Sequence, residues 1–221
     1  MGREETIFAQ RRVRRVPALP DDWESLERVF RAFPSRREER FAWRTACALV
    51  YQKLLVQGHM GLPALIPGLV HARLATALLA AGYRTKRQLA GRSLLCLGCH
   101  AGLEVRILRD FGARAEGLEI RQDVVEAAVN ACLVQRGEVE AADYWEYLSQ
   151  PPRALRHDIF MLAPEEVPVE TLWNAAKSHL TAKGHLVIVA QPSDMVGVPT
   201  VAERGVALEG TMQWCRLTAE D

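Results

Sequence analysis

The sequence of 221 residues predicts an α/β protein with a mostly parallel sheet, a C-terminal antiparallel hairpin and a helical segment ahead of the sheet. Short apolar runs alternate with amphipathic stretches from residue 91 onward, and glycine or proline marks most of the changes. The two parts also differ in charge, because residues 1–90 hold 16 basic and 8 acidic side chains while residues 91–221 hold 12 and 19. We therefore divide the chain into a basic N-terminal arm with a helical cap, 1–90, and a sheet domain, 91–221.

Residues 1–90 show helical patterns and no strand pattern. An arginine-rich arm without a sustained period reaches Pro20, and Asp21-Asp22 is typical of a helix N-cap. Apolar spacing predicts helices over about 23–33, 37–56 and 68–80, the last followed by Gly82 as a residue typical of a helix end. Residues 46–90 contain no Asp or Glu, so this segment suits a neutral or anionic binding partner, or a contact with the acidic sheet domain.

From residue 93 onward, strands and helices alternate. We expect strands at 93–97, 115–120, 138–142, 157–162 and 185–189, helices at about 103–111, 123–137, 144–149 and 169–180, and a closing hairpin of 206–209 with 212–217. Alternation at this spacing predicts parallel strands with both faces covered by helices.

Several classes of protein are disfavoured by the ends of the chain and by its cysteines. The N-terminus shows no apolar run typical of a signal peptide, and the most apolar stretch, 61–81, is interrupted by prolines, His71 and Arg73. The odd number of cysteines favours reduced thiols over a disulfide framework: Cys47, Cys96, Cys99, Cys132 and Cys215. We expect a cytoplasmic protein without membrane association.

The turn after the first predicted strand, Gly98-Cys99-His100-Ala101-Gly102, is the candidate ligand-binding loop. Ligands of open α/β sheets bind where the strands end, and glycine permits close backbone approach there. The turn lacks the G-x-G-x-x-G pattern of dinucleotide-binding proteins, because His100 and Leu103 stand at two of the glycine positions. No Gly-Lys-Ser/Thr follows it, which disfavours a phosphate-binding loop.

Cys96 to His100 also reads C-x-x-C-H, the attachment signature of c-type haem. Haem attachment requires export and accessible cysteines, whereas Cys96 lies inside an apolar strand pattern. No second cysteine pair completes four zinc ligands, so no metal site is predicted.

The segment Leu94 to Gly102 resembles motif I of the class I S-adenosylmethionine-dependent methyltransferases, in which a strand ending in an acid leads into G-x-G-x-G. Gly98 and Gly102 keep the first and third glycines. The chain departs from the pattern twice, because Cys96 replaces the acid and His100 replaces the middle glycine.

Two later positions and one segment extend the resemblance. Glu119 stands where the family places the acid that hydrogen-bonds the ribose hydroxyls, and Asp143 stands where a residue commonly contacts the adenine amino group. Leu180 to Val187 is similar to the entry into the family's fifth strand. A bland alternative stays open, in which the glycines serve only the turn and Asp143 only caps the next helix.

The resemblance implies a Rossmann-like methyltransferase fold with S-adenosylmethionine as cofactor. The cofactor-binding residues that it implies are Gly98, Cys99, His100, Gly102, Glu119, Ile120, Asp143 and Tyr144. Methyl transfer relies largely on positioning, so we assign no catalytic residue. The acid and base candidates, each more typical of a structural role, are His59, His71, Tyr83, His157 and His185.

Our leading hypothesis is methyl transfer to a small-molecule acceptor. Residues 160–166 lack the Asn/Asp-Pro-Pro-Tyr/Phe motif of methyltransferases that act on amino groups of bases or glutamine. One alternative is a binding or assembly subunit that has lost catalysis, motivated by Cys96 and His100. Another is an RNA methyltransferase that uses the basic N-terminal region as a nucleic-acid contact. The oligomeric state stays open, with a homodimer as one option.

Overall fold

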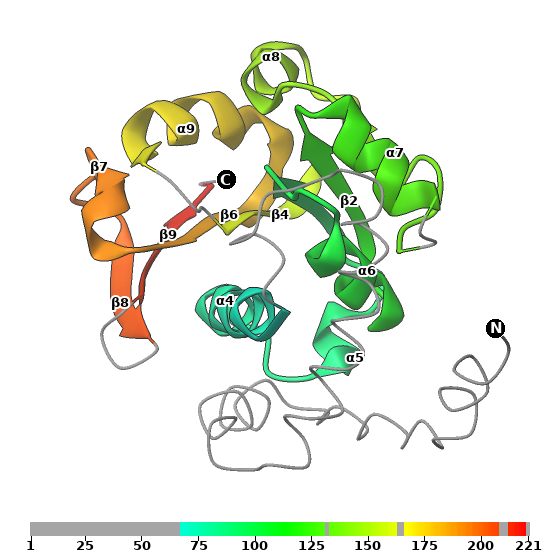
Figure 1. Cartoon of the computed structure of the whole chain (residues 1–221). Helices are drawn as coiled ribbons and strands as arrows, with labels where there is room; N and C mark the ends of the chain where they lie inside the picture. Colours follow the sequence, from blue (N-terminus) through cyan, green and yellow to red (C-terminus); the bar gives the residue numbers. More distant parts are fainter. Residues whose placement is uncertain (1–66, 131–132, 163–165, 208–211, 220–221) are drawn as a thin grey trace, which may run out of the picture.

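A seven-stranded sheet with helices on both faces forms the centre of the molecule (Figure 1). The computed structural model describes residues 67–130, 133–162, 166–207 and 212–219. The strands follow the order β3-β2-β1-β4-β6-β9-β8 across the sheet. Their bounds are β1 (Ser93–Leu97), β2 (Arg114–Glu119), β3 (Val139–Ala141), β4 (Arg156–Leu162), β6 (Leu180–Ala190), β8 (Glu203–Ala207) and β9 (Met212–Thr218).

The strands from β3 to β6 in this order run parallel, and β9 lies antiparallel between β6 and β8. Because β1 lies between β2 and β4, the turn that leaves β1 stands beside the carboxyl ends of both neighbours. We call this edge, at which β1, β2, β3 and β4 end, the carboxyl edge. It is where parallel sheets bind ligands.

The helices before and between the strands are mostly short. Their bounds are α4 (Pro67–Ala80), α5 (Lys86–Leu89), α6 (Leu103–Asp110), α7 (Gln122–Asn130), α8 (Tyr144–Ser149) and α9 (Val169–Ala176), with 3₁₀ turns η2 (Lys177–His179) and η3 (Pro192–Asp194). A small second sheet pairs β5 (Val167–Pro168) with β7 (Met195–Val196). In Figure 1, α4 lies on one side of the central sheet and α8 and α9 lie on the other.

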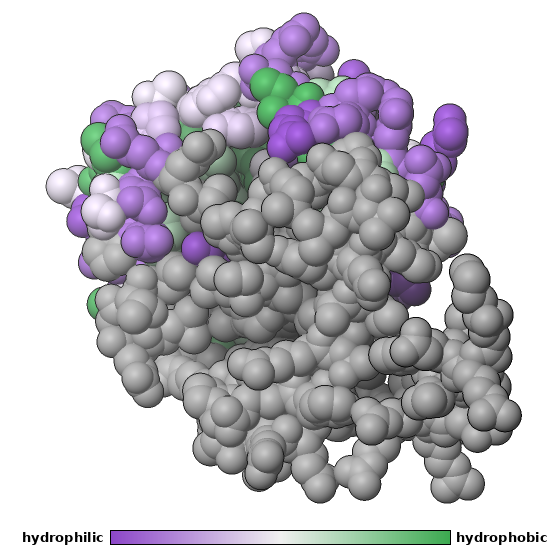
Figure 2. Space-filling view, in the orientation of Figure 1, coloured by the Kyte–Doolittle hydropathy of each residue, from purple (hydrophilic) through white to green (hydrophobic). Residues whose placement is uncertain are grey.

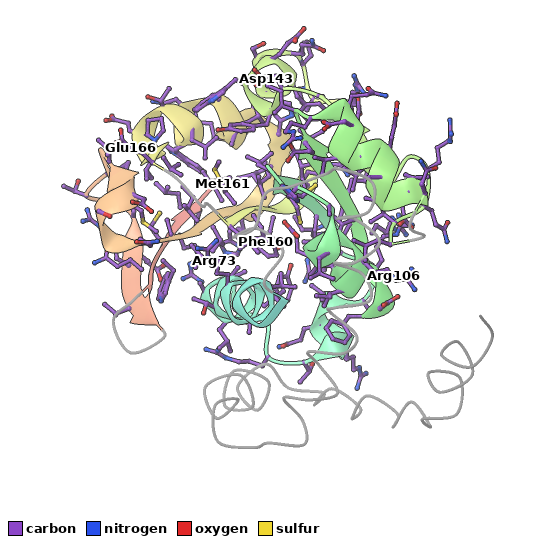
Figure 3. All side chains as sticks on the ribbon, viewed as in Figure 1. Arg73, Arg106, Asp143, Phe160, Met161 and Glu166 are labelled. Carbon is purple, nitrogen blue, oxygen red and sulfur yellow. The ribbon has the colours of Figure 1, made fainter. Side chains whose placement is uncertain are left out.

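Alternating strand residues fill two apolar layers. Cys96, Phe160 and Val187 pack with α4, α6 and α7, whereas Ile159 and Met161 pack with α8 and α9 on the opposite face. Figure 3 shows this alternation on β4, where Phe160 lies on the side of α4 and Met161 on the side of α9. The period of two thus accounts for strands that are apolar on both faces.

The structure confirms the predicted fold class, the parallel strands and the closing antiparallel hairpin. It also confirms the end of the third predicted helix, because α4 stops at Ala80 and Gly82 adopts φ 88°. The two helices predicted earlier in the chain lie outside the described residues. The division at residue 90 stays a prediction, although α4 packs against β4, β6 and β9.

Two details near β6 differ from the sequence prediction. The last crossover helix is shorter than expected, because α9 ends at Ala176 and β6 already begins at Leu180. Gly184 lies inside this strand, where a Cβ atom would stand 2.6 Å from the carbonyl oxygen of His157. The glycine read as a lead-in to the strand therefore permits close approach of β4, next to an irregularity in its pairing between Arg156 and Asp158.

Polar and intermediate residues make up most of the described surface in Figure 2, with hydrophobic residues in small groups. In the ranges that the structure describes, no helix combines the length and apolar character needed to span a bilayer.

Candidate functional site

The turn between β1 and α6 is held by backbone hydrogen bonds at the carboxyl edge. The Cys99 N–H donates to the Leu118 carbonyl oxygen over 3.0 Å, which ties the turn to the end of β2. The Gly102 N–H donates to the Cys99 carbonyl oxygen over 2.8 Å, which closes the turn on itself. Gly98, His100 and Gly102 all have positive φ, at 60°, 49° and 73°. Glycine adopts this region freely, whereas a side chain such as that of His100 is strained by about 1 kcal/mol.

The two glycines have different surroundings. A Cβ on Gly102 would lie 2.7 Å from the Val139 side chain and 3.0 Å from that of Val134. This glycine therefore permits the turn to pack against β3 and against the loop that precedes it. A Cβ on Gly98 would meet nothing within 4 Å. The backbone at Gly98 is therefore accessible at the carboxyl edge, as close approach of a ligand requires.

Glu119, the last residue of β2, joins the turn to the next loop. One carboxylate oxygen accepts the His100 N–H over 2.9 Å, and the other accepts the Arg121 N–H over 3.1 Å. The residue is only 7% exposed. A carboxylate offers about four lone-pair sites, so acceptor capacity remains on both oxygens.

Asp143 and its neighbours stand at the end of β3. The Asp143 carboxylate accepts the Trp145 N–H over 2.7 Å and caps α8, beside which Figure 3 places it. Asp143 therefore caps the following helix, which is the alternative role predicted from the sequence. Tyr144 is half-buried with its ring 5.2 Å from that of Trp145, and Ile120 is 66% exposed.

The side chains of Cys96 and Cys99 belong to the core. Both thiols are fully buried, and burial raises their pKa well above the ordinary value. A Cβ on Gly117 would lie 2.4 Å from the Cys99 Sγ, so this thiol occupies the space that glycine leaves on β2. Any ligand contact of Cys99 would therefore come from its backbone.

The His100 imidazole is half-buried, and burial lowers its pKa although the nearby Glu119 carboxylate acts in the opposite sense. Its Nδ1 is buried without a hydrogen-bond partner in the described structure. A neutral imidazole with a free ring nitrogen is the state expected at neutral pH.

Two charged residues that the sequence reasoning did not select lie beside this turn. Glu104, in the first turn of α6, is 7% exposed, and Arg73 of α4 is 8% exposed. Burial raises the Glu104 pKa to about 7; a hydrogen bond to its own backbone opposes this shift, the Glu119 charge adds to it, and the Arg73 charge opposes it. The sequence signal was a charged residue at a position where the helical pattern expects an apolar one.

The acid and base candidates on the strands lie away from the turn. Asp158 is level with Leu94 near the start of β1, where it accepts hydrogen bonds from the Tyr83 hydroxyl and, over 2.6 Å, from His185 Nδ1. Burial and the Asp158 carboxylate raise the Tyr83 pKa. His157 accepts the Ser93 N–H over 3.0 Å at the same end of the sheet. These residues satisfy a buried polar network, and His59 lies outside the described residues.

Among the side chains that the structure places, no group of three or more His, Cys, Asp or Glu is arranged to hold a metal ion.

The arrangement of the strands and the placement of a glycine turn and an acid at the carboxyl edge define a class of fold. The chain resembles yhhF from Escherichia coli, assigned as a methyltransferase, with a TM-score of 0.53 and 12% identity over 67% of this chain and 86% of that one. It resembles MtNAS, determined as a mutant in complex with S-adenosylmethionine, with a TM-score of 0.52 and 14% identity over 91% of this chain and 85% of that one.

A third solved structure, a protein from Haemophilus influenzae assigned as a methylase, has a TM-score of 0.50 and 11% identity over 62% of this chain and 91% of that one. No family model and no curated protein matches the sequence. At these identities the likeness concerns the fold, and the chain has the Rossmann-like fold of class I methyltransferases.

Proposed function

We propose that this chain binds S-adenosylmethionine at the carboxyl edge and transfers its methyl group to a small-molecule acceptor. The observation that carries the proposal is the Glu119 carboxylate, which lies at the end of β2 and accepts the N–H of His100 from the glycine turn. In this proposal the Glu119 carboxylate accepts the ribose hydroxyls of a donor that approaches the open backbone of Gly98. Both features belong to a fold that MtNAS shares and that in MtNAS accommodates S-adenosylmethionine.

The residues present fit such a ligand. Each Glu119 oxygen already accepts one N–H, and the remaining lone pairs suit the two ribose hydroxyls. Asp143 uses Oδ1 to cap α8, and we assign its Oδ2 to the adenine amino group. The exposed Ile120 side chain and the half-buried Tyr144 offer apolar surface to the adenine ring. Gly98, Cys99, His100 and Gly102 contribute backbone.

The bound sulfonium supplies an activated methyl group: a lone pair of the acceptor forms the new bond to carbon, the carbon–sulfur bond breaks, and its electron pair stays on sulfur. The protein's own task is then to hold the donor in line with the acceptor and to exclude water. An acceptor that carries a proton loses it to solvent or to a base, and none of the acid and base candidates that the structure describes on β4 and β6 lies at the turn.

A second candidate function is a binding or assembly subunit that holds the donor without catalysis. It is favoured by the departures at Cys96 and His100, where the imidazole stands at a position that the family leaves to glycine. The RNA alternative rests mainly on arginines before residue 67 and stays a prediction.

Calorimetric titration of the full chain with S-adenosylhomocysteine tests the binding step. We expect micromolar affinity, and Glu119→Gln should weaken it about tenfold or more, because a hydrogen bond to a charged group contributes about 1.5–3 kcal/mol. Glu116→Gln is the matched control. Glu116 lies on the same strand, but its carboxylate accepts a hydrogen bond of 2.6 Å from Arg156 and does not contact the turn. No binding by a folded wild-type chain would defeat the proposal.

Transfer of a tritiated methyl group to a panel of small molecules and RNAs then separates the enzyme from the subunit. A labelled small molecule supports the proposal. Binding without any labelled product, together with a stable protein partner, favours the second function, and labelled RNA favours the RNA alternative.

A further inference from the structure

Arg73 and Glu104 are buried charges without ion-pair partners in the part of the chain that the structure describes. The Arg73 Nε is buried and has no hydrogen-bond partner there. Transfer of an unpaired ion out of water costs several kcal/mol, so buried charges are normally paired or used. The Glu104 carboxylate has a hydrogen bond to its own backbone, so what both residues lack in the described structure is a partner of opposite charge.

Both residues belong to the carboxyl edge. Glu104 lies two residues after Gly102, in the first turn of α6, and its charge raises the pKa of Cys96 and Cys99. Arg73 projects from α4, which packs against α6, and Figure 3 shows it between α4 and the sheet. Burial lowers the Arg73 pKa, and the carboxylates of Asp194, in η3 after β6, and of Glu104 oppose this shift.

Their helices pack against each other and each charge acts on the pKa of the other, yet among the described residues no salt bridge joins Arg73 to Glu104. A group that carries a carboxylate and an ammonium on neighbouring atoms would pair with both at once. Guanidinium binds carboxylate through two parallel hydrogen bonds, and a carboxylate accepts from an ammonium. The α-amino-acid arm of a sulfonium donor is such a group.

We propose that Arg73 and Glu104 form a zwitterion clamp for this arm, with Arg73 on its carboxylate and Glu104 on its ammonium. The inference rests on the proposed function and extends it to residues outside the recognised motif. It also offers a substitute for the motif I acid that Cys96 replaces, because Glu104 supplies from α6 a carboxylate that the end of β1 lacks.

The clamp is tested by comparing ligands that differ only in this arm. The full chain is titrated with S-adenosylhomocysteine, with its deamino analogue, and with 5′-methylthioadenosine, which lacks the arm. The wild type should bind S-adenosylhomocysteine about tenfold or more tightly than either analogue. Equal affinity for all three ligands would overturn the clamp while leaving the proposed function standing, whereas no binding of any ligand would defeat the proposed function itself.

Variants assign the two halves of the clamp. Glu104→Gln should weaken S-adenosylhomocysteine about tenfold and leave the deamino analogue and 5′-methylthioadenosine within about twofold. Arg73→Met should weaken both S-adenosylhomocysteine and the deamino analogue while sparing 5′-methylthioadenosine. Arg106 is a half-exposed arginine on α6 that pairs with Asp110 over 3.0 Å, so Arg106→Met is the matched control and should change the affinity for none of the three ligands.

Retained binding of 5′-methylthioadenosine shows that a variant is folded. A purely structural role would weaken all three ligands by the same factor, and no effect on any ligand would mean that the arm lies elsewhere. Either result overturns the clamp. If Arg73→Met does not fold, the affinities of the wild type and of Glu104→Gln for the three ligands still test the clamp.

Discussion

The burial of Glu104 predicts that the ligand-free protein loses stability as the pH rises. The Glu104 pKa is raised from 4.5 to about 7, chiefly because the buried carboxylate loses its hydration. Between these two values the unfolded chain releases the proton while the folded chain keeps it, so the free energy of unfolding falls with increasing pH. Above the pKa of the folded state Glu104 is ionised in both states, and the whole loss in the free energy of unfolding is present.

The size of this cost follows from the shift. One pKa unit corresponds to about 1.4 kcal/mol, so a rise from 4.5 to about 7 amounts to ~3 kcal/mol. Glu104→Gln keeps the shape and removes the charge. We therefore expect the variant to be about 3 kcal/mol more stable than the wild type near pH 8, and about equally stable near pH 4.5, where Glu104 is protonated in the folded chain.

Urea unfolding of both proteins at the two pH values measures this difference directly. Because only one charge changes, the dependence on urea concentration should stay the same and only the midpoint should move. Glu126→Gln, on the exposed face of α7, is the control and should have a small effect at both pH values. A Glu104→Gln variant that is less stable than the wild type near pH 8 would refute the reasoning, because it would mean that Arg73 compensates the buried anion.

Three further predictions concern the turn, the cap and the thiols. Gly98→Ala should lower the free energy of unfolding by about 1 kcal/mol because of its positive φ. Gly102→Ala should lower it by about 2–4 kcal/mol, because its Cβ would also lie 2.7 Å from the Val139 side chain. Equal midpoints of urea unfolding for the two variants would contradict this. Asp143→Ala should lose about 1 kcal/mol of stability and Asp143→Ser should restore it, while calorimetry should show weakened S-adenosylhomocysteine binding in both; full affinity in the serine variant would limit Asp143 to capping. Three buried thiols have a raised pKa that keeps them protonated: Cys96, Cys99 and Cys215. Alkylation mapped by mass spectrometry should leave all three unmodified in the native protein and modify all three in urea.

Local chemistry made the sheet and the glycine turn predictable. Ser93 to Leu97 is a continuous apolar run followed by glycine, and that pattern has few structural alternatives at the start of a βα unit. Glu119 was found because it ends a strand, and parallel strands bring their ends to one edge.

Arg73 and Glu104 could not be found in the same way. The helical pattern marks Glu104 as a charge at a position that expects an apolar residue, but a glutamate in the first turn of a helix is equally typical of an exposed acid that favours the helix dipole. Its burial depends on tertiary packing, in which α4 contacts α6, and that contact joins segments about 30 residues apart in the sequence. The short β5 and β7 were missed for a related reason, because each has two residues and is defined by its partner.

The two departures from motif I have a physical account in this structure. At position 100 the turn uses the backbone N–H, which donates to Glu119, so a histidine preserves this contact at the cost of a positive φ. Position 96 faces the layer of α4 and α6 and lies close enough to Glu104 for the two to interact electrostatically. A carboxylate at position 96 would place two like charges in one buried volume, which raises the free energy of the ionised site. A neutral thiol at position 96 is therefore compatible with a carboxylate at position 104, and the site keeps one carboxylate for the ammonium of the ligand that we propose.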